Sequence, residues 1–87
     1  MRLKLASGHE ELWVEFPEDT PLNVAQLLQS VRDRWPGLYQ RCCDKDGTVR
    51  KSLPVFVNGE HIRYRDGMET ELHDGSEVYV IPIVAGG

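Results

Sequence analysis

The apolar residues of this chain repeat with two different periods, and this change of period restricts the fold more than any other feature. The first stretch, MRLKLA, alternates apolar and polar positions, and ELWVEF alternates in the same way a few residues later. Such alternation is typical of strands with one buried face. The link between them, SGHE, is short, polar and contains a glycine, so the two stretches are predicted to form an antiparallel hairpin.

The next segment changes to the period of an α-helix. Apolar side chains now recur at intervals of three and four residues, which places them on one face of a helix. They are Val24, Leu27, Leu28, Val31 and Trp35. Thr20 is a suitable N-cap, and Pro21 suits the first turn, where no backbone N–H is needed. Pro36 and Gly37 should end this helix after about four turns.

The second half contains turn signals between short strand-like runs. Asn58-Gly59 separates two such runs, which is a strong hairpin signal. A helical turn is expected over 38–42, and two Asp-Gly pairs flank a short segment, 69–72. The closing EVYVIPIV is rich in β-branched residues and predicts a last strand. The order is β-β-α-β-β-β, which favours an α+β fold with one main helix across one face of a mixed sheet.

The two periods also predict the core. Strand residues of one parity should face one stripe of the helix. The predicted core is Leu3, Leu5, Leu12, Val14, Val24, Leu27, Leu28, Val31, Val55, Val57, Val78 and Val80. A helical crossover between the first hairpin and the later strands also permits the terminal strands to pair in parallel.

Composition excludes several classes of function. A chain of 87 residues can bury one modest core, so a single domain is expected. The net charge of −4 disfavours non-specific nucleic-acid binding and suits basic protein partners. No apolar run reaches the ~20 residues that span a bilayer, and the start of the chain is unlike a signal peptide. We therefore expect a cytoplasmic protein without membrane contact.

The residues that could hold a metal or act as nucleophiles are poorly spaced for either role. Cys42 and Cys43 are adjacent, which disfavours a disulfide between them, and two cysteines are too few for zinc or iron–sulfur sites. His9, His61 and His73 lack the spacing of metal-ligand pairs. No metal site and no nucleophile–base pair are predicted.

The chain finishes on VIPIVAGG, in which a strand-like run leads into two glycines. Together with Asn58-Gly59 and the stretch DGSEV at 74–78, this ending resembles the β-grasp sulfur-carrier family, the MoaD/ThiS family. The stretch from 55 to 87 is most similar to the cysteine-synthesis type of carrier. The first half of the chain supports only the ubiquitin-like β-grasp fold that the family shares.

The resemblance implies a carrier whose chemistry takes place at the chain terminus. In the family, a ubiquitin-activating-type adenylyltransferase uses ATP to adenylate the terminal glycine, and sulfur then displaces AMP to give a thiocarboxylate. Here Gly87 would be the reactive residue and Gly86 its companion, with no processing protease needed. The chain would be a protein co-substrate rather than an enzyme, a monomer when free, with no bound cofactor. A domain over 1–83 would carry a flexible tail over 84–87.

Two alternative functions fit the same sequence. The chain could be a ubiquitin-like modifier whose Gly87 is conjugated to lysine, or the small subunit of a molybdopterin-synthase-type complex. The sulfur-accepting biosynthetic enzyme, and with it the pathway, is not indicated by the sequence.

Strand parity predicts where partners dock. If Val78 and Val80 face the helix, the side chains between and after them face the opposite side. The predicted partner-binding residues are Phe56, His61, Tyr79 and Ile81, with Val84 and Ala85 on the tail. Trp13 is either a contact at the border of this surface or a cross-strand neighbour.

Overall fold

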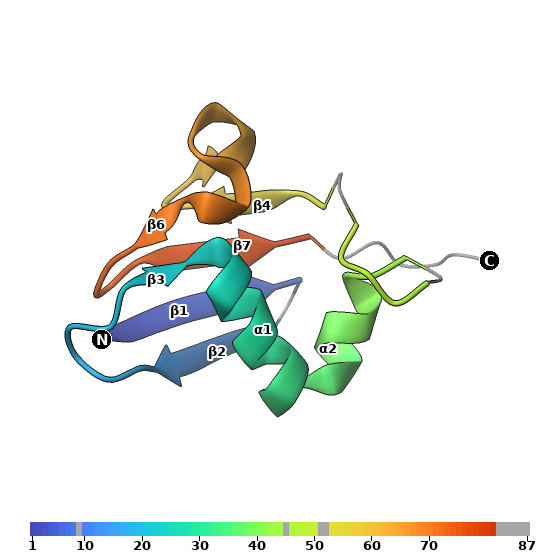
Figure 1. Cartoon of the computed structure of the whole chain (residues 1–87), viewed down its shortest axis with the longest axis horizontal. Coiled ribbons are helices and arrows are strands. Elements are labelled where there is room, and N and C mark those ends of the chain that lie inside the picture. The colour runs from blue at the N-terminus through green and yellow to red at the C-terminus, as the bar shows by residue number, and fades with distance from the viewer. Residues whose placement is uncertain (9, 45, 51–52, 82–87) are drawn as a thin grey trace.

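The computed structural model describes residues 1–8, 10–44, 46–50 and 53–81 and shows a mixed sheet with helices across one face (Figure 1). Five strands lie in the order β2-β1-β7-β4-β5, and β3 and β6 form a separate pair. The strands are β1 (Arg2–Ser7), β2 (Glu10–Glu15), β3 (Leu22–Asn23), β4 (Val55–Val57), β5 (Glu60–His61), β6 (Glu71–Leu72) and β7 (Glu77–Val80). The helices are α1 (Val24–Arg34) and α2 (Pro36–Arg41), with two 3-10 turns, η1 (Ile62–Tyr64) and η2 (Gly67–Glu69). This is the α+β arrangement that the two periods predicted.

The N-terminal hairpin and the parallel pairing of the terminal strands are both confirmed. β1 and β2 are antiparallel, and Leu3 lies opposite Val14. β7 is parallel to β1, with Leu5 opposite Val78, and antiparallel to β4 on its other side. The last strand therefore occupies the centre of the sheet, between the first hairpin and the second.

The Asn-Gly turn also forms as predicted. Asn58 and Gly59 have φ values of 51° and 86°, the two positive values that a type I′ hairpin turn requires. The Asn58 side-chain oxygen accepts a hydrogen bond from the Glu77 N–H at 2.9 Å, which ties the turn to the start of β7. The strand after the turn is shorter than predicted, because the chain leaves β5 at His61 and enters η1.

The first helix begins later than the sequence predicted. Its N-cap is Asn23, not Thr20, and the side chains of Asn23 and Gln26 each accept a hydrogen bond from the other's backbone N–H at 2.9 Å. This reciprocal capping box satisfies two backbone donors that would otherwise lack partners. The helix cannot start earlier because Leu22 lies in β3, opposite Leu72 of β6. α1 has 11 residues, about three turns instead of four.

The helix ends where Pro36 predicted, but a second helix follows at once. Pro36 is the first residue of α2, which includes most of the helical turn predicted over 38–42. Trp35 links the two helices and is only partly buried against the core, although its spacing placed it on the apolar stripe. α1 ends at Arg34, so Trp35 caps the helix and does not belong to its buried apolar face.

The core lies between the sheet and the helices. All of the predicted core residues are buried except Leu12, which lies on the edge strand β2 and is only partly buried. The sequence did not identify the core residues contributed by loops and short elements. These are Leu22, Leu38, Cys42, Leu53, Ile62 and Leu72.

No helix within the described residues is long and apolar enough to span a bilayer. The predicted boundary between a domain over 1–83 and a tail over 84–87 lies outside the described residues.

Candidate functional site

β7 is the strand that leads toward the C-terminal glycines, and its side chains alternate between the two sides of the sheet. Val78 and Val80 are buried in the core, whereas Glu77 and Tyr79 are exposed on the other side. Ile81 continues the pairing after β7, because its N–H donates to the Pro54 carbonyl at 3.0 Å. The candidate site residues Val84, Ala85, Gly86 and Gly87 lie outside the described residues.

The sheet face opposite the helices brings three of the predicted partner-binding residues together. Tyr79 on β7 lies opposite Phe56 on β4, and Phe56 lies opposite His61 on β5. The rings of Phe56 and His61 meet edge to face, with centroids 5.1 Å apart. We call Phe56, His61, Tyr79 and Ile81 the docking face; its role in binding stays a prediction.

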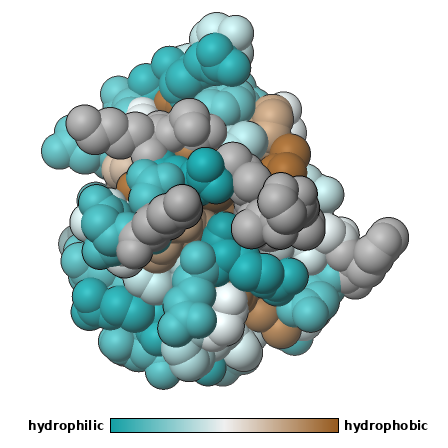
Figure 2. All heavy atoms as spheres, turned by 90° about the vertical axis from the view of Figure 1, so that its right-hand side faces the viewer, coloured by the Kyte–Doolittle hydropathy of each residue, from teal (hydrophilic) through white to brown (hydrophobic). Residues whose placement is uncertain are grey.

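The docking face exposes large apolar side chains. Tyr79 is 41% exposed and Ile81 is 42% exposed, while Phe56 and His61 are half-buried. At the end of the molecule toward which β7 runs, most of the visible described surface is hydrophilic, and apolar atoms appear only in small groups (Figure 2). Since exposed apolar clusters often mark interaction sites, the docking face is a candidate for protein contact.

Trp13 lies on the same side of the sheet but is separated from the docking face. β1 lies between Trp13 on β2 and Tyr79 on β7, and it carries Lys4, whose ammonium lies 3.3 Å from the Glu11 carboxylate. The guanidinium of Arg2, diagonally across on β1, stacks over the Trp13 ring at 4.2 Å from its centroid. The structure shows a cross-strand contact for Trp13, and a role at the border of the docking face stays a prediction.

The sequence missed Tyr64, which extends the aromatic row beyond the sheet. Its ring centroid lies 6.5 Å from that of His61, and the residue is 73% exposed. A strand continuing from His61 would have turned Tyr64 to the buried side, but η1 instead turns it outward. Ile62 is buried in η1 as it would be in a continuing strand, so its apolar side chain gave no signal of this turn.

The two cysteines occupy different environments. Cys42 is a core residue, and burial, followed by the neighbouring Cys43, raises the pKa of its thiol. A buried thiol that resists ionisation is a poor nucleophile. Cys43 is partly exposed and its Sγ donates to the Tyr39 carbonyl at 3.1 Å. Within the described part of the chain, no three His, Cys, Asp or Glu side chains are grouped as metal ligands.

Comparison with known proteins places the chain in one family. The ThiS family matches residues 6–87. A protein of Archaeoglobus fulgidus named as a candidate sulfur carrier is 42% identical over all of this chain and 96% of its own length. Small archaeal modifier protein 3 of Haloferax volcanii is 39% identical, covering 92% of this chain and 84% of the relative. The sulfur carrier protein CysO of Mycobacterium tuberculosis is 29% identical, covering 74% and 71%.

Solved structures support the same assignment. A crystal structure of small archaeal modifier protein 1 from Haloferax volcanii has a TM-score of 0.76 at 20% identity, covering both chains completely, and so supports the fold. The BexX/CysO complex of Amycolatopsis orientalis contains a chain with a TM-score of 0.68 and 25% identity, covering 98% of this chain and 99% of that one. The chain therefore belongs to the ThiS/MoaD family of ubiquitin-like sulfur carriers with a β-grasp fold.

Proposed function

We propose that the Gly87 carboxylate is the reactive group of this sulfur carrier. A ubiquitin-activating-type adenylyltransferase would transfer AMP from ATP to this carboxylate and release pyrophosphate. A sulfur nucleophile would then attack the acyl carbon and displace AMP, leaving a thiocarboxylate for a sulfur-accepting biosynthetic enzyme. The observation that carries the proposal is the family match, which runs through Gly86 and Gly87 to residue 87.

The chemistry of the tail supports this role. Glycine has no Cβ, so two glycines in succession can pass through a channel too narrow for other residues. The six residues 82–87 can reach at most roughly 20 Å, at about 3.3 Å each. That reach is enough for the terminal carboxylate to enter a partner's active site while the folded domain stays outside. ATP would be a substrate of the partner, so the carrier itself needs no bound cofactor.

The docking face would hold the carrier against its partners. Tyr79 lies on the strand that leads into the tail, and Ile81 follows that strand directly. A partner that covers these side chains would also receive residues 82–87. Val84 and Ala85 would then contact the channel through which the glycines pass.

Replacing Ile81 with aspartate should weaken binding to the adenylyltransferase by about tenfold or more, or about 1.4 kcal/mol. Ile81 is 42% exposed, so a charge there disrupts an apolar contact without entering the core. Calorimetric titration of the carrier into the enzyme measures the effect. Gln29→Glu is the matched control, since it adds the same charge on an exposed position of α1. Equal affinities of Ile81→Asp and the unchanged protein would contradict docking on this face.

A second function is favoured by one comparison. The 39% identical relative from Haloferax volcanii is named a modifier, which in this chain would mean an isopeptide bond between Gly87 and a lysine. Both functions begin with the same acyl-adenylate, so adenylation alone does not separate them.

Mass spectrometry of the intact carrier separates the two functions. After incubation with ATP, the adenylyltransferase and a sulfide donor, the expected product carries one sulfur in place of a carboxylate oxygen at Gly87. A control without ATP should keep its original mass. Lysine adducts through Gly87 in the absence of any thiocarboxylate would favour the modifier instead.

A further inference from the structure

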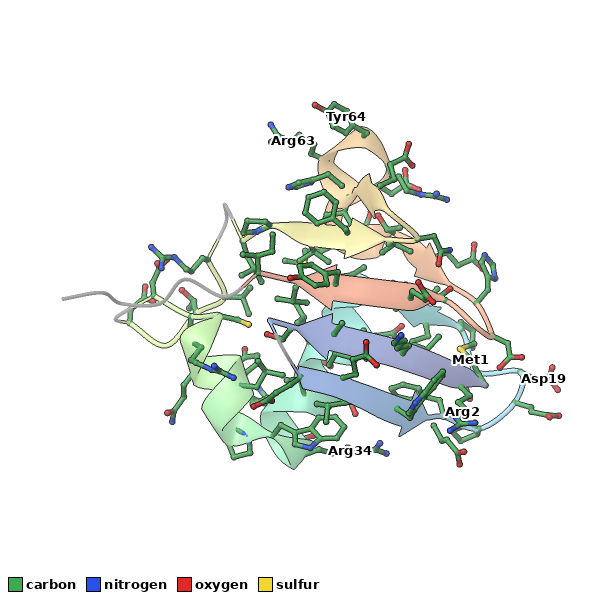
Figure 3. The ribbon with its side chains drawn as sticks, turned by 180° about the vertical axis from the view of Figure 1, so that it is seen from behind. Met1, Arg2, Asp19, Arg34, Arg63 and Tyr64 are labelled. Atoms are coloured by element: carbon green, nitrogen blue, oxygen red, sulfur yellow. The ribbon has the colours of Figure 1, made fainter. Side chains whose placement is uncertain are left out.

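The turn η1 presents two side chains that the docking face does not include. Tyr64 is 73% exposed, more than the other exposed large apolar residues, Trp13, Tyr79 and Ile81. Arg63 is also exposed, and its guanidinium lies 5.5 Å from the centre of the Tyr64 ring. Both side chains project from the end of the molecule beyond β4 and β5 (Figure 3). We call Arg63 and Tyr64 the second anchor, because they lie beyond the docking face, which is the first predicted contact surface.

The conformation of η1 is held by one buried side chain and two hydrogen bonds. Ile62 is buried in the core at only 5% exposure. The His61 imidazole Nδ1 accepts a hydrogen bond from the Arg63 N–H at 3.0 Å, and the Arg65 N–H donates to the Ile62 carbonyl at 2.9 Å. A turn whose backbone is already ordered pays no cost for ordering it on binding, so more of the contact energy appears as affinity.

The charge of the anchor indicates the kind of surface that it fits. Arg65 forms an ion pair with Glu60 at 3.3 Å. Arg63 belongs to none of the ion pairs within 4.0 Å in the described part of the chain. In a chain with a net charge of −4, Arg63 thus presents a guanidinium that no described carboxylate pairs with, beside an exposed aromatic ring. Tyrosine and arginine are enriched among the residues that dominate interface energies, and arginine pairs best with carboxylates.

The anchor continues the docking face. An edge-to-face row of rings runs from Phe56 through His61 to Tyr64, and Phe56 lies opposite Tyr79. Strands in a sheet are about 4.8 Å apart, so the row extends roughly 10 Å from β7 to β5 before it reaches η1. A standard interface of about 800 Å² per partner is wide enough to include both.

We propose that the second anchor binds the activating adenylyltransferase, with Tyr64 in an apolar slot and Arg63 paired to an Asp or Glu beside it. The proposal rests on the proposed function, since it takes the enzyme that adenylates Gly87 as the partner. This enzyme is the one partner that both the carrier and the modifier require. The second anchor does not touch the reacting atoms, so it contributes to binding and not to the chemical step.

The test uses the full chain with the adenylyltransferase from the same genome, in an ATP–pyrophosphate exchange assay. Tyr64→Ser should raise the KM for the carrier about tenfold or more and leave kcat unchanged, because only binding is lost. Arg63→Glu should raise KM most at low ionic strength. Its difference from the unchanged protein should shrink with added salt, because the Debye length falls to about 10 Å at 0.1 M.

Arg34→Glu is the matched control for charge. Arg34 is also exposed, but it lies at the opposite end of the molecule in the view of Figure 3. Its KM should equal that of the unchanged protein, and circular dichroism should show that all three variants fold.

The outcomes distinguish the two proposals. If the unchanged carrier supports exchange and both second-anchor variants match its KM, the second anchor is refuted while the proposed function stands. If the unchanged carrier supports no exchange, the proposed function fails and the second anchor fails with it. A dimer of the unchanged chain that Tyr64→Ser dissociates, seen by sedimentation, would assign the second anchor to a second copy and overturn its assignment to the enzyme.

Discussion

Removing Gly87, or adding one residue after it, is expected to abolish adenylation while leaving the fold intact. One residue moves the terminal carboxylate by up to about 3.6 Å along an extended chain. Reacting atoms must approach to about 3–3.5 Å with correct alignment, so a displacement of this size removes the reaction. Among the described residues the core extends to Val80, seven residues before Gly87, so a change at the terminus should leave that core intact.

ATP–pyrophosphate exchange measures the loss of adenylation, and thermal melting followed by circular dichroism measures the fold. Gly86→Ala is a graded comparison, because it keeps the chain length and adds only a methyl group near the reactive end. We expect it to reduce exchange without abolishing it. Full exchange by the extended chain, with its extra residue still present by mass spectrometry, would exclude Gly87 as the site of reaction.

The largest effect on stability is expected from Leu27→Ala, which should lower the free energy of unfolding by about 2–5 kcal/mol. Leu27 is fully buried on the side of α1 that faces the sheet, so its removal leaves a cavity that the fixed backbone cannot close. Small domains are stable by only about 5–15 kcal/mol in total. Denaturant unfolding at a fixed pH measures the loss.

The same helix provides the control for this prediction. Gln29 is exposed two residues further along α1, and glutamine and alanine are both good helix formers. Gln29→Ala should therefore change the free energy of unfolding by less than about 0.5 kcal/mol. If Leu27→Ala cost no more than Gln29→Ala, the helix would not pack on the sheet in the orientation described.

The sequence predicted those parts of the fold that depend on local pattern. Alternation placed Leu3, Leu5 and Val14 on one side of the first hairpin, and Asn58-Gly59 set the second turn, because both signals act between near neighbours. The start of α1 was wrong for the opposite reason. Thr20 and Asn23 can both cap a helix, and the choice depends on Leu22 pairing with Leu72, fifty residues away.

In the candidate site, too, the sequence predicted what depends on local pattern and missed what does not. Parity along β4 and β7 correctly put Phe56 and Tyr79 on the side of the sheet away from the core, although their role in binding is still a prediction. Tyr64 was missed because η1 has no periodic signal, and the burial of Ile62 is expected from a strand as well as from this turn. Gly86 and Gly87 were identified from the family resemblance, since no physical pattern in the chain distinguishes a reactive glycine from an inert one.

The central position of β7 has a mechanical consequence. If the proposed entry of the tail into a partner exerted a pull along the axis of β7, it would load this strand lengthwise. The hydrogen bonds to β1 and β4 run across that axis, so the load falls on both ladders at once and they must break together. An edge strand pulled in the same direction would be held by only one ladder. The central position of β7 therefore gives the C-terminal end of the domain more resistance to such a pull than an edge position would.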